Sequence, residues 1–302
     1  MIKLQVKKFF RFKVSGVMNY NPKLNMVIDG NEFSYKFFET LECIAKTYSQ
    51  REAAKRLGVS HSVLNRRIRE SEEKFAARLV ETTGAGSGLT EKGYEILDKY
   101  ESYMKRLEER KKPIICGGYV STGLMEILVQ EYNLDATILR TDDLSALELA
   151  DKDMVDILTL DDPVTAFIYD LDFVPIAYDY LVLVGDELIT DIDELYGKNF
   201  LEIPNSSQRL AWNTLDNMNI DYNIVKLVKS PYNALKSIND NKKLFTFLNK
   251  SLTDGSDILK DETTHLISLV LLNNENQHLK NFVEFIVGDG QNIIEMNGFT
   301  RI

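Results

Sequence analysis

The segment Gln50–Phe75, QREAAKRLGVSHSVLNRRIRESEEKF, decides the fold of the first third of the chain. It predicts a short helix over Gln50–Leu57, a sharp turn at Gly58, and a second helix that begins at the capping residue Ser60 and runs to about Ala77. Glycine suits the turn because it readily adopts the positive φ that a sharp reversal requires. The spacing is that of a helix-turn-helix. Its small core is expected to hold Ala54, Leu57, Leu64 and Ile68.

Hydrogen-bonding and cationic side chains remain on the outward face of these two helices. Such side chains can bond base edges and phosphates in the major groove of DNA. We therefore expect this face to bind double-stranded DNA, although the pattern also allows an ordinary three-helix bundle with a solvated, charged face. The candidate DNA contacts are Arg51, Lys55, Ser60, His61, Ser62, Asn65, Arg66 and Arg69.

The residues before this motif predict a hairpin and a first helix. Asp29-Gly30 is a tight-turn pair inside Leu24–Tyr35, and Ser34 stands where it can cap the helix that follows. Residues 1–20 alternate apolar and basic types and are expected to be extended. A single buried stripe on the helix is predicted from the spacing of Phe37, Leu41, Ile44 and Tyr48.

The residues after the motif predict a β-wing. Two β-prone segments, residues 79–83 and 89–90, flank the glycine-rich tip Gly84–Gly88. A tip with few side chains can come close to a phosphate backbone or a minor groove. Gly86 and Ser87 are therefore further candidate DNA contacts.

A long helix over Glu91–Arg110 is predicted next, with Thr90 as its cap. Its apolar residues recur with the a and d spacing of a coiled coil, which would let two copies of the chain pair and present two recognition helices to a palindromic site. These residues are Leu97, Tyr100, Met104 and Leu107.

Charge divides the chain at the end of this helix. Residues 1–112 hold 23 lysines and arginines against 15 acidic residues, a net charge of +8, whereas residues 113–302 carry −18. A basic segment suits phosphate binding, and an acidic one is repelled by DNA. We expect three parts: a winged helix-turn-helix over residues 1–90, a linker and dimerisation helix over 91–112, and an α/β ligand-sensing domain over 113–302.

Strands and helices alternate after Pro113, which stops the long helix. This alternation predicts a parallel α/β sheet. Strands are expected at Ile114–Cys116, Ala136–Arg140, Met154–Leu158, Phe173–Ile176, Tyr180–Val184, Phe200–Ile203 and Ile224–Val228. Helices are expected up to Tyr132 and at Leu144–Leu149, Gln208–Met218, Tyr232–Asn239 and His278–Ile286.

Two loop-to-helix junctions in this part carry hydroxyl groups where helix N-termini are expected. They are Ser121-Thr122, beside several glycines, and Asn205–Arg209. Free backbone N–H groups and hydroxyls at a helix N-terminus bind anions, and Arg209 could add a charged fork. Plain helix capping is the alternative explanation for both junctions.

The N-terminal third resembles the DNA-binding domains of LysR-type and ModE-type regulators. The resemblance rests on the run Ser49–Ser60, on the wing Leu79–Thr90, and on Leu89-Thr90-x-x-Gly93. The glycine-rich wing and the preceding hairpin are closer to ModE, the molybdate-responsive regulator. The resemblance implies a winged helix-turn-helix that binds DNA as a homodimer or homotetramer.

The C-terminus resembles type II periplasmic-binding-protein-like domains in its Phe282–Gln291 helix and its Gly298-Phe299 ending. That resemblance implies two α/β lobes with a ligand in the cleft between them, where helix N-termini hold an oxyanion such as molybdate or tungstate. The candidate ligand contacts that it implies are Ser121, Thr122, Asp161, Ser206, Ser207, Arg209, Ser230 and Tyr232.

The leading hypothesis is a cytoplasmic transcriptional regulator controlled by a small ligand, without catalytic residues or a cofactor. No nucleotide-binding or nucleophile motif is present, and no metal-ligand spacing joins the three histidines to Cys43 or Cys116. No signal segment or membrane span is recognisable in the sequence. Two alternatives remain open: a repressor fused to a catalytic domain, and a regulator whose second domain only dimerises.

Overall fold

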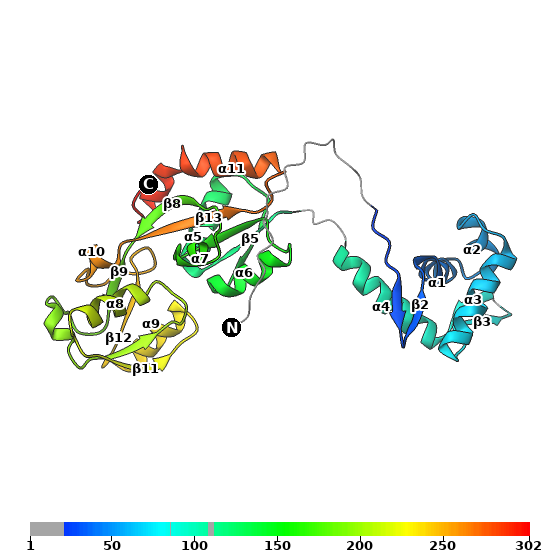
Figure 1. Ribbon diagram of the computed structural model, residues 1–302, viewed down its shortest axis with the longest axis horizontal. Helices are drawn as coiled ribbons and strands as arrows, with labels where there is room; N and C mark the ends of the chain where they lie inside the picture. Colours follow the sequence, from blue (N-terminus) through cyan, green and yellow to red (C-terminus); the bar gives the residue numbers. More distant parts are fainter. Residues whose placement is uncertain (1–20, 85, 108–111) are drawn as a thin grey trace. The chain divides into compact units, whose positions relative to one another are not determined.

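The computed structural model describes residues 21–84, 86–107 and 112–302. The chain divides into an N-terminal unit within residues 7–110 and a C-terminal unit within residues 111–302 (Figure 1). The expectation that residues 1–20 are extended lies outside the described residues. No described helix is long and apolar enough to cross a lipid bilayer.

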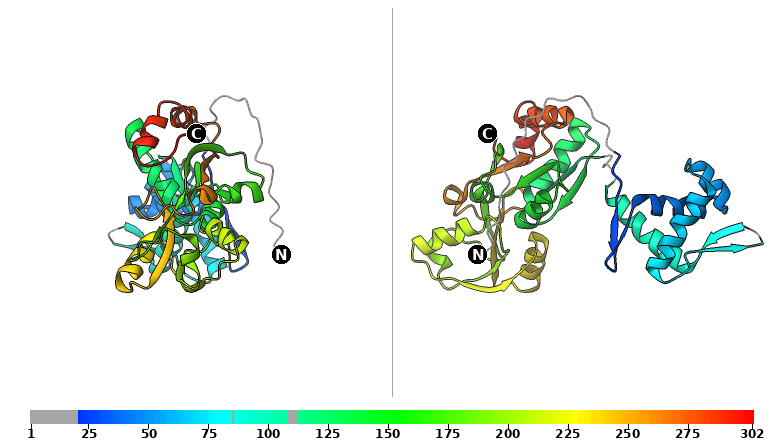
Figure 2. Two further views of the ribbon diagram at one scale, coloured as in Figure 1. Left: turned by 90° about the vertical axis from the view of Figure 1, so that its left-hand side faces the viewer. Right: turned by 45° about the vertical axis from the view of Figure 1, so that its right-hand side comes forward.

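The N-terminal unit is a winged helix-turn-helix preceded by a hairpin. The predicted turn at Asp29-Gly30 joins two antiparallel strands, and both turn residues have positive φ. Two further antiparallel strands form the wing (Figure 2, cyan). The elements are β1 Met26–Ile28, β2 Asn31–Phe33, α1 Tyr35–Thr47, α2 Gln50–Arg56, α3 His61–Phe75, β3 Val80–Thr83, β4 Gly86–Leu89 and α4 Glu91–Leu107.

Helix ends in this unit follow the predicted caps with one exception. The hydroxyl of Ser60 accepts a hydrogen bond from the Val63 amide at the start of α3, and Gly58 has φ of +64° in the turn before it. Ser34 occupies the cap position of α1 but its side chain makes no capping bond. The Asn25 side chain accepts from the Tyr35 amide instead, at 2.9 Å, because the hairpin brings it to the helix.

The core of the N-terminal unit includes α4. Leu97 and Tyr100 are buried, and the Tyr100 ring stacks on Phe38 at 4.1 Å between centroids. These two residues were predicted to form the first half of a coiled-coil seam. The prediction is wrong for them because the core of their own domain already buries them, while Leu107 at the far end is 44% exposed. The remaining core residues include Phe33, Phe37, Leu41, Ile44, Leu64, Ile68 and Leu79.

The C-terminal unit has two α/β lobes. Lobe 1 is built on a five-stranded sheet of order β6-β5-β7-β13-β8, with α5, α11 and α12 on one face and α6 and α7 on the other. Its elements are β5 Ile114–Gly117, α5 Tyr119–Tyr132, β6 Thr137–Arg140, α6 Asp143–Asp151, β7 Ile157–Leu160, α7 Val164–Ile168, β8 Val174–Asp179, β13 His265–Leu271, α11 Gln277–Val287 and α12 Gln291–Met296.

Lobe 2 is built on a four-stranded sheet of order β11-β10-β12-β9, with α8 and α10 packed on one face and α9 on the other. Its elements are β9 Leu181–Val184, the 3-10 helix η1 Ile192–Leu195, β10 Asn199–Glu202, α8 Arg209–Asn217, β11 Asn223–Leu227, α9 Pro231–Asp240, β12 Leu244–Asn249 and α10 Lys260–Thr263.

Both sheets are mixed rather than parallel, which corrects the sequence-based expectation. β13 runs antiparallel to β7 and β8, and β12 runs antiparallel to β9. These two strands were not among those predicted, since an apolar run such as Leu266–Leu272 is compatible with a buried helix as well as a strand. The chain passes between the lobes from β8 to β9 and returns from β12 to β13.

Candidate DNA-binding face and ligand cleft

The outward face of the helix-turn-helix is formed by the predicted DNA contacts. On α3 the buried side is made by Leu64, Ile68 and Ser71, so the opposite side faces solvent. A row of polar and cationic side chains along one exposed helix face is the arrangement that major-groove recognition requires. All eight predicted contacts on α2, the turn and α3 are exposed: Arg51, Lys55, Ser60, His61, Ser62, Asn65, Arg66 and Arg69.

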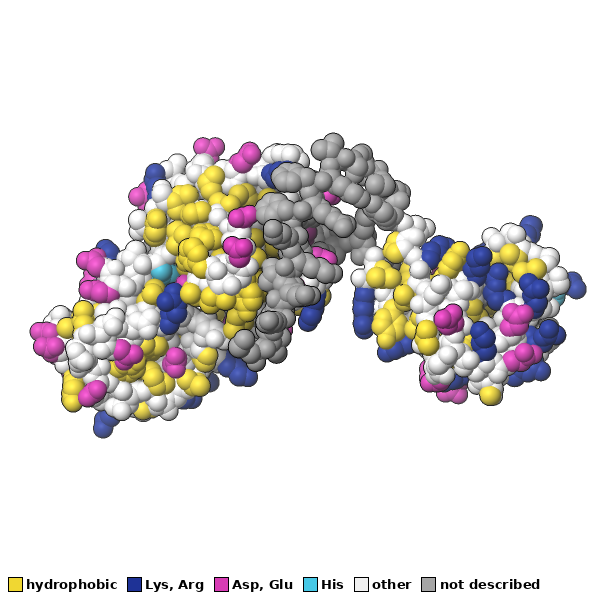
Figure 3. Space-filling model, in the orientation of Figure 1, with side chains coloured by type: hydrophobic (Ala, Val, Ile, Leu, Met, Phe, Trp, Pro, Cys, Tyr) yellow, Lys and Arg dark blue, Asp and Glu magenta, His cyan; other side chains and the backbone are white. Residues whose placement is uncertain are grey.

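The two arginines at the centre of this face have only loose partners. Arg66 lies 3.7 Å from Glu70, and Arg69 lies 3.7 Å from Glu73, one helical turn away in each case. The side chains of Arg66 and Arg69 are 65% and 73% exposed, respectively. Exposed pairs of this spacing contribute only about 0.3–0.5 kcal/mol, so a DNA phosphate can replace the glutamate. Figure 3 shows several such basic side chains on the surface of the N-terminal unit.

A groove of about 600 Å³ separates α3 from the wing. Asn65 and Arg69 line it from α3, while Arg78 and Thr82 line it from the wing side. Helix α3 and the wing therefore share one concave surface, lined by polar and charged residues together with Ile68 and Val80.

The wing residues predicted to touch DNA instead attach the wing to the domain. Ser87 is only 9% exposed, and its amide donates to the Tyr48 carbonyl at 2.9 Å. Gly86 has φ of +138°, and a Cβ there would lie 2.4 Å from the same carbonyl oxygen. The predicted contact between the Ser87 side chain and DNA is therefore corrected, because this side chain is buried within the domain.

Gln50 completes this attachment and was not predicted as a functional residue. Its side-chain amide donates to the hydroxyls of Ser87 at 3.2 Å and Thr82 at 3.4 Å, joining the start of α2 to both wing strands. The sequence patterns mark Gln50 only as a helix start, since the partner hydroxyls lie more than 30 residues away. The wing is thereby held next to the helix-turn-helix.

A cavity of about 580 Å³ lies between the two lobes of the C-terminal unit. Two predicted ligand contacts line it from opposite lobes, Asp161 from lobe 1 and Ser206 from lobe 2. Asn205 and Lys229 also line it, although neither was among the candidate ligand contacts. Other side chains at this cavity are Tyr119, Arg140, Asp142 and Asp143 of lobe 1, and Ile203, Leu227 and Val228 of lobe 2.

The N-terminus of α5, predicted to hold an anion, is bonded to the carboxylate of Asp161. This carboxylate accepts from the amide of Ser121 at 2.7 Å and from the amide of Val120 at 3.1 Å. A Cβ at Gly118 would lie 2.2 Å from the Asp161 carboxyl group, so glycine is what lets the carboxylate reach the helix.

The hydroxyls of this junction do not face the cavity. Ser121 and Thr122 are both fully buried. Thr122 donates to the Gly118 carbonyl and accepts from the Arg140 guanidinium at 2.9 Å, while the Ser121 hydroxyl has no hydrogen-bond partner within the described part of the chain. The structure therefore corrects the expectation that these side chains contact a ligand.

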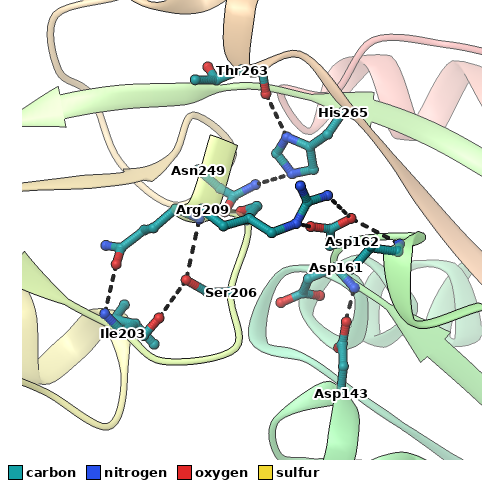
Figure 4. Close-up of polar contacts among 12 residues, drawn as sticks. Asp143, Asp161, Asp162, Ile203, Ser206, Arg209, Asn249, Thr263 and His265 are labelled. Atoms are coloured by element: carbon teal, nitrogen blue, oxygen red, sulfur yellow. Dashed lines mark hydrogen bonds and ion pairs between the residues drawn. The ribbon is translucent and has the colours of Figure 1, made fainter. Parts of the chain in front are cut away.

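Arg209, the predicted charged fork, pairs with Asp162 across the cleft (Figure 4). Its Nε donates to Asp162 Oδ2 at 2.6 Å, and its Nη2 donates to Oδ1 at 2.8 Å. The Asp162 side chain is 6% exposed and that of Arg209 is 42% exposed. Arg209 begins α8 of lobe 2, and Asp162 follows β7 of lobe 1. This bidentate ion pair therefore joins the two lobes.

The neighbouring carboxyl group of Asp143 has a raised pKa. Burial raises the pKa of Asp143 well above its ordinary value, and the nearby charge of Asp161 raises it further. Asp143 Oδ1 accepts from the Asp161 amide at 3.4 Å (Figure 4). The end of β7 thus brings three acidic residues, Asp143, Asp161 and Asp162, into one small region.

Of the four remaining predicted ligand contacts, one lies at the cavity and three do not. Ser206 bonds the Ile203 carbonyl at 2.7 Å and stays at the cavity edge. Ser207 is buried and donates to Asn249, Ser230 caps α9, and Tyr232 is 73% exposed on that helix. None of these last three residues lines the cavity, so the structure does not bring them to the cleft.

Where the chain crosses between the lobes, a buried polar network joins the crossing segments. The Asn249 amide donates to Asp179 at 3.1 Å and to His265 Nε2 at 3.0 Å, while His265 Nδ1 bonds the Thr263 carbonyl at 2.7 Å. This pattern places the imidazole proton on Nδ1. Burial raises the pKa of Asp179. Within the described residues, no group of three His, Cys, Asp or Glu side chains is arranged to hold a metal ion.

Comparison with known proteins supports both halves of this architecture. Residues 35–94 match the family described as bacterial regulatory helix-turn-helix protein, lysR family. The uncharacterised HTH-type transcriptional regulator MJ1120 of Methanocaldococcus jannaschii is 33% identical over 227 residues, which cover 70% of this chain and 75% of that protein.

The chain also aligns with two solved structures, of which the first shows the fold of the C-terminal unit. A putative phosphate ABC transporter substrate-binding protein from Clostridium perfringens aligns with a TM-score of 0.52 and 14% identity, over 64% of this chain and 100% of that one. The LysR family transcriptional regulator CbnR aligns with a TM-score of 0.45 and 16% identity, over 84% of this chain and 100% of that one.

The fold and the relatives define a DNA-binding transcriptional regulator in which a winged helix-turn-helix precedes a two-lobed, periplasmic-binding-protein-like unit. The chain belongs to the LysR family of helix-turn-helix regulators. The predicted fold and the LysR-type resemblance are confirmed. The ModE-like subtype that the glycine-rich wing indicated is not confirmed.

Proposed function

We propose that this regulator recognises specific DNA sequences through the exposed face of α3, and that a small ligand in the interlobe cleft controls this binding. The observation that carries the first half is the row of exposed, loosely paired side chains from His61 to Arg69 on a helix whose other side is buried. The cavity between the lobes supports the second half, since ligand sites of two-lobed α/β domains lie between lobes.

The +8 charge of residues 1–112 supports a large phosphate contribution to binding. The experiment is fluorescence anisotropy with the full chain and duplex DNA selected from a random-sequence library. We expect one enriched sequence class and a log–log salt slope of several units, since each contacted phosphate adds about 0.9. Recovery of no enriched sequence, or a flat salt response, would contradict the proposal.

One finer feature belongs to the proposal, and a second, the oxyanion effector, does not. The regulator acts in the cytoplasm as a homodimer or homotetramer, for which the exposed end of α4 at Leu107 is one available surface. Sedimentation velocity of the full chain tests the assembly. An oxyanion such as molybdate or tungstate is the effector that the sequence resemblance implies, and the contacts of Asp161 argue against it at α5.

Ligand control is tested by a thermal-shift screen of small molecules followed by anisotropy in the presence of each stabilising compound. We expect at least one compound both to raise the melting temperature and to change DNA affinity, because a ligand that prefers one lobe arrangement shifts the population. A compound that stabilises the protein without changing DNA affinity would separate the sensor from the DNA-binding function.

A further inference from the structure

Two consecutive aspartates follow β7, and the carboxylate of each accepts hydrogen bonds from donors that could otherwise bind an anion. Asp161 accepts both amides at the N-terminus of α5, and Asp162 accepts the guanidinium fork of Arg209 from lobe 2. A helix N-terminus and an arginine fork are the two strongest anion-binding elements of this region. The chain supplies its own anion to both.

The Asp161 contact is a close structural fit. The carboxylate uses one oxygen for each amide, at 3.1 Å for Val120 and 2.7 Å for Ser121. Gly118 leaves the space that it needs, as a Cβ there would overlap the carboxyl group. Charge-assisted bonds of this kind are strong, and a second anion at the same amides would meet an occupied position and a like charge.

The Asp162 contact has a different consequence, because its two partners belong to different lobes. The pair is bidentate, with donor–acceptor distances of 2.6 and 2.8 Å, and Asp162 is almost fully buried. An anion that bound between lobes would draw them together through such a fork. Here the carboxylate of Asp162 makes that connection from within the chain.

We propose that Asp161 and Asp162 act as a built-in substitute for an oxyanion, so that the cleft excludes free oxyanions and is specific for ligands that present hydrogen-bond donors, cationic or neutral, to Asp161. This inference rests on the proposed ligand cleft and deepens it. Asp161 is the specificity-determining residue, and Asp162 holds the Nε–Nη2 edge of Arg209, which an oxyanion would otherwise use.

The lining of the cavity agrees with this ligand class. Lobe 1 lines the cavity with three acidic residues, Asp142, Asp143 and Asp161. The one cationic side chain that the described residues of lobe 1 add to this lining, Arg140, is bonded to Thr122 and paired with Glu126. Lobe 2 contributes Asn205, Ser206 and Lys229 on the opposite side. A ligand that donates toward lobe 1 and accepts from lobe 2 would satisfy both sides.

The experiment measures binding of inorganic phosphate, sulfate and molybdate to the full chain by isothermal titration calorimetry and thermal shift. For the wild type we expect no binding at millimolar anion concentrations. Asp161→Ala frees the two α5 amides and should raise anion affinity by about tenfold or more, since both a like charge and an occupied position are removed.

The matched control is Asp142→Asn, which removes a negative charge from the same cavity, keeps a side-chain oxygen that can cap α6, and leaves the α5 amides bonded to Asp161. Like the wild type, this variant should show no binding at millimolar anion concentrations. An equal gain in both variants would overturn the proposal, because cavity charge alone would then explain the exclusion. Submillimolar binding of any of these oxyanions to the wild-type chain would also overturn it, whether or not the variants fold.

These outcomes are independent of the proposed DNA function, because anion binding is measured without DNA. Circular dichroism of Asp161→Ala checks that the variant is folded. A folded variant that binds anions no better than wild type would show that Asp161 does not determine specificity. The regulator could still bind DNA with its full affinity in that case.

Discussion

Two arginine-bearing surfaces of this regulator look alike in sequence and differ in structure. Arg66 and Arg69 on α3 keep most of their exposure and lie 3.7 Å from single glutamates. Arg209 in the C-terminal unit makes two short bonds to the buried Asp162. The first surface keeps its bonding capacity for an external anion, whereas Arg209 has given the Nε–Nη2 edge of its guanidinium to a carboxylate of the same chain.

The comparison shows why residue type predicts the chemistry of a surface but not its availability. A guanidinium can bind a phosphate only when its donors are not already engaged by a carboxylate. The same distinction holds at helix N-termini, since the amides of α5 are occupied by Asp161.

The largest effect is expected on α3. Arg66→Ala with Arg69→Ala should weaken binding to the selected DNA by about 30-fold or more, because each arginine contact to DNA is worth ~1–3 kcal/mol. Anisotropy titrations at moderate salt measure this. Lys236→Ala with Lys243→Ala removes the same charge from an exposed part of lobe 2 and should change affinity by less than about twofold. Similar losses in both double variants would mean that net charge, not the α3 face, governs binding.

The next largest effect is a loss of stability on breaking the ion pair between Arg209 and Asp162, which joins the lobes. Arg209→Ala should lower the stability of the C-terminal unit by roughly 1–3 kcal/mol, because it leaves the buried Asp162 carboxylate without its charged partner. Urea unfolding followed by tryptophan fluorescence at Trp212 measures this. The exposed pair between Arg301 and Glu295 provides the control, and Arg301→Ala should cost less than about 0.5 kcal/mol. Equal costs would show that the interlobe pair is no stronger than a surface one.

A loss of stability of similar size is expected in the wing. Gly86→Ala should destabilise the N-terminal unit by roughly 1–3 kcal/mol, since the positive φ and the Tyr48 carbonyl both oppose a side chain there. Gly88→Ala on the same strand has open space around its Cβ and should change stability by less than about 0.5 kcal/mol. Thermal melts of the two variants decide the matter, and matching melting temperatures would contradict the attachment of the wing to Tyr48.

The smallest effect is a pH dependence at Asp143. Its folded-state pKa lies above the unfolded one, so the folded protein binds this proton more tightly and its stabilising contribution is lost as pH rises from about 4 through the folded-state value. Asp143→Asn keeps an acceptor and cannot ionise. The variant should therefore gain in melting temperature relative to wild type as pH rises across that window. A difference that does not vary with pH would show that Asp143 does not titrate as proposed.

Local patterns predicted much of the N-terminal unit. Periodicity, the Ser60 cap and Asp29-Gly30 depend on neighbouring residues only, and the structure has a hairpin, three helices and a wing where they were expected. The exposed recognition face followed directly, because a buried stripe at Leu64 and Ile68 fixes what must point outward.

Contacts between distant residues could not be predicted in the same way. The bonds of Gln50 to the wing, of Asp161 to α5, and of Arg209 to Asp162 join segments separated by 32 to 47 residues. Strands β12 and β13 were missed for a related reason, since an apolar run alone does not distinguish a strand from a buried helix. The cleft residues were therefore identified by type, while their partners were not.

The sheet order of lobe 1 also determines when this protein can fold on the ribosome. β13 lies between β7 and β8, and β8 has no other neighbouring strand in that sheet. A nascent chain that has emerged only as far as lobe 2 therefore holds β8 without a partner, with its apolar face uncovered until residues 265–271 leave the exit tunnel. The winged unit can form early in synthesis, but the two-lobed unit is completed only near the end, when translation has almost finished.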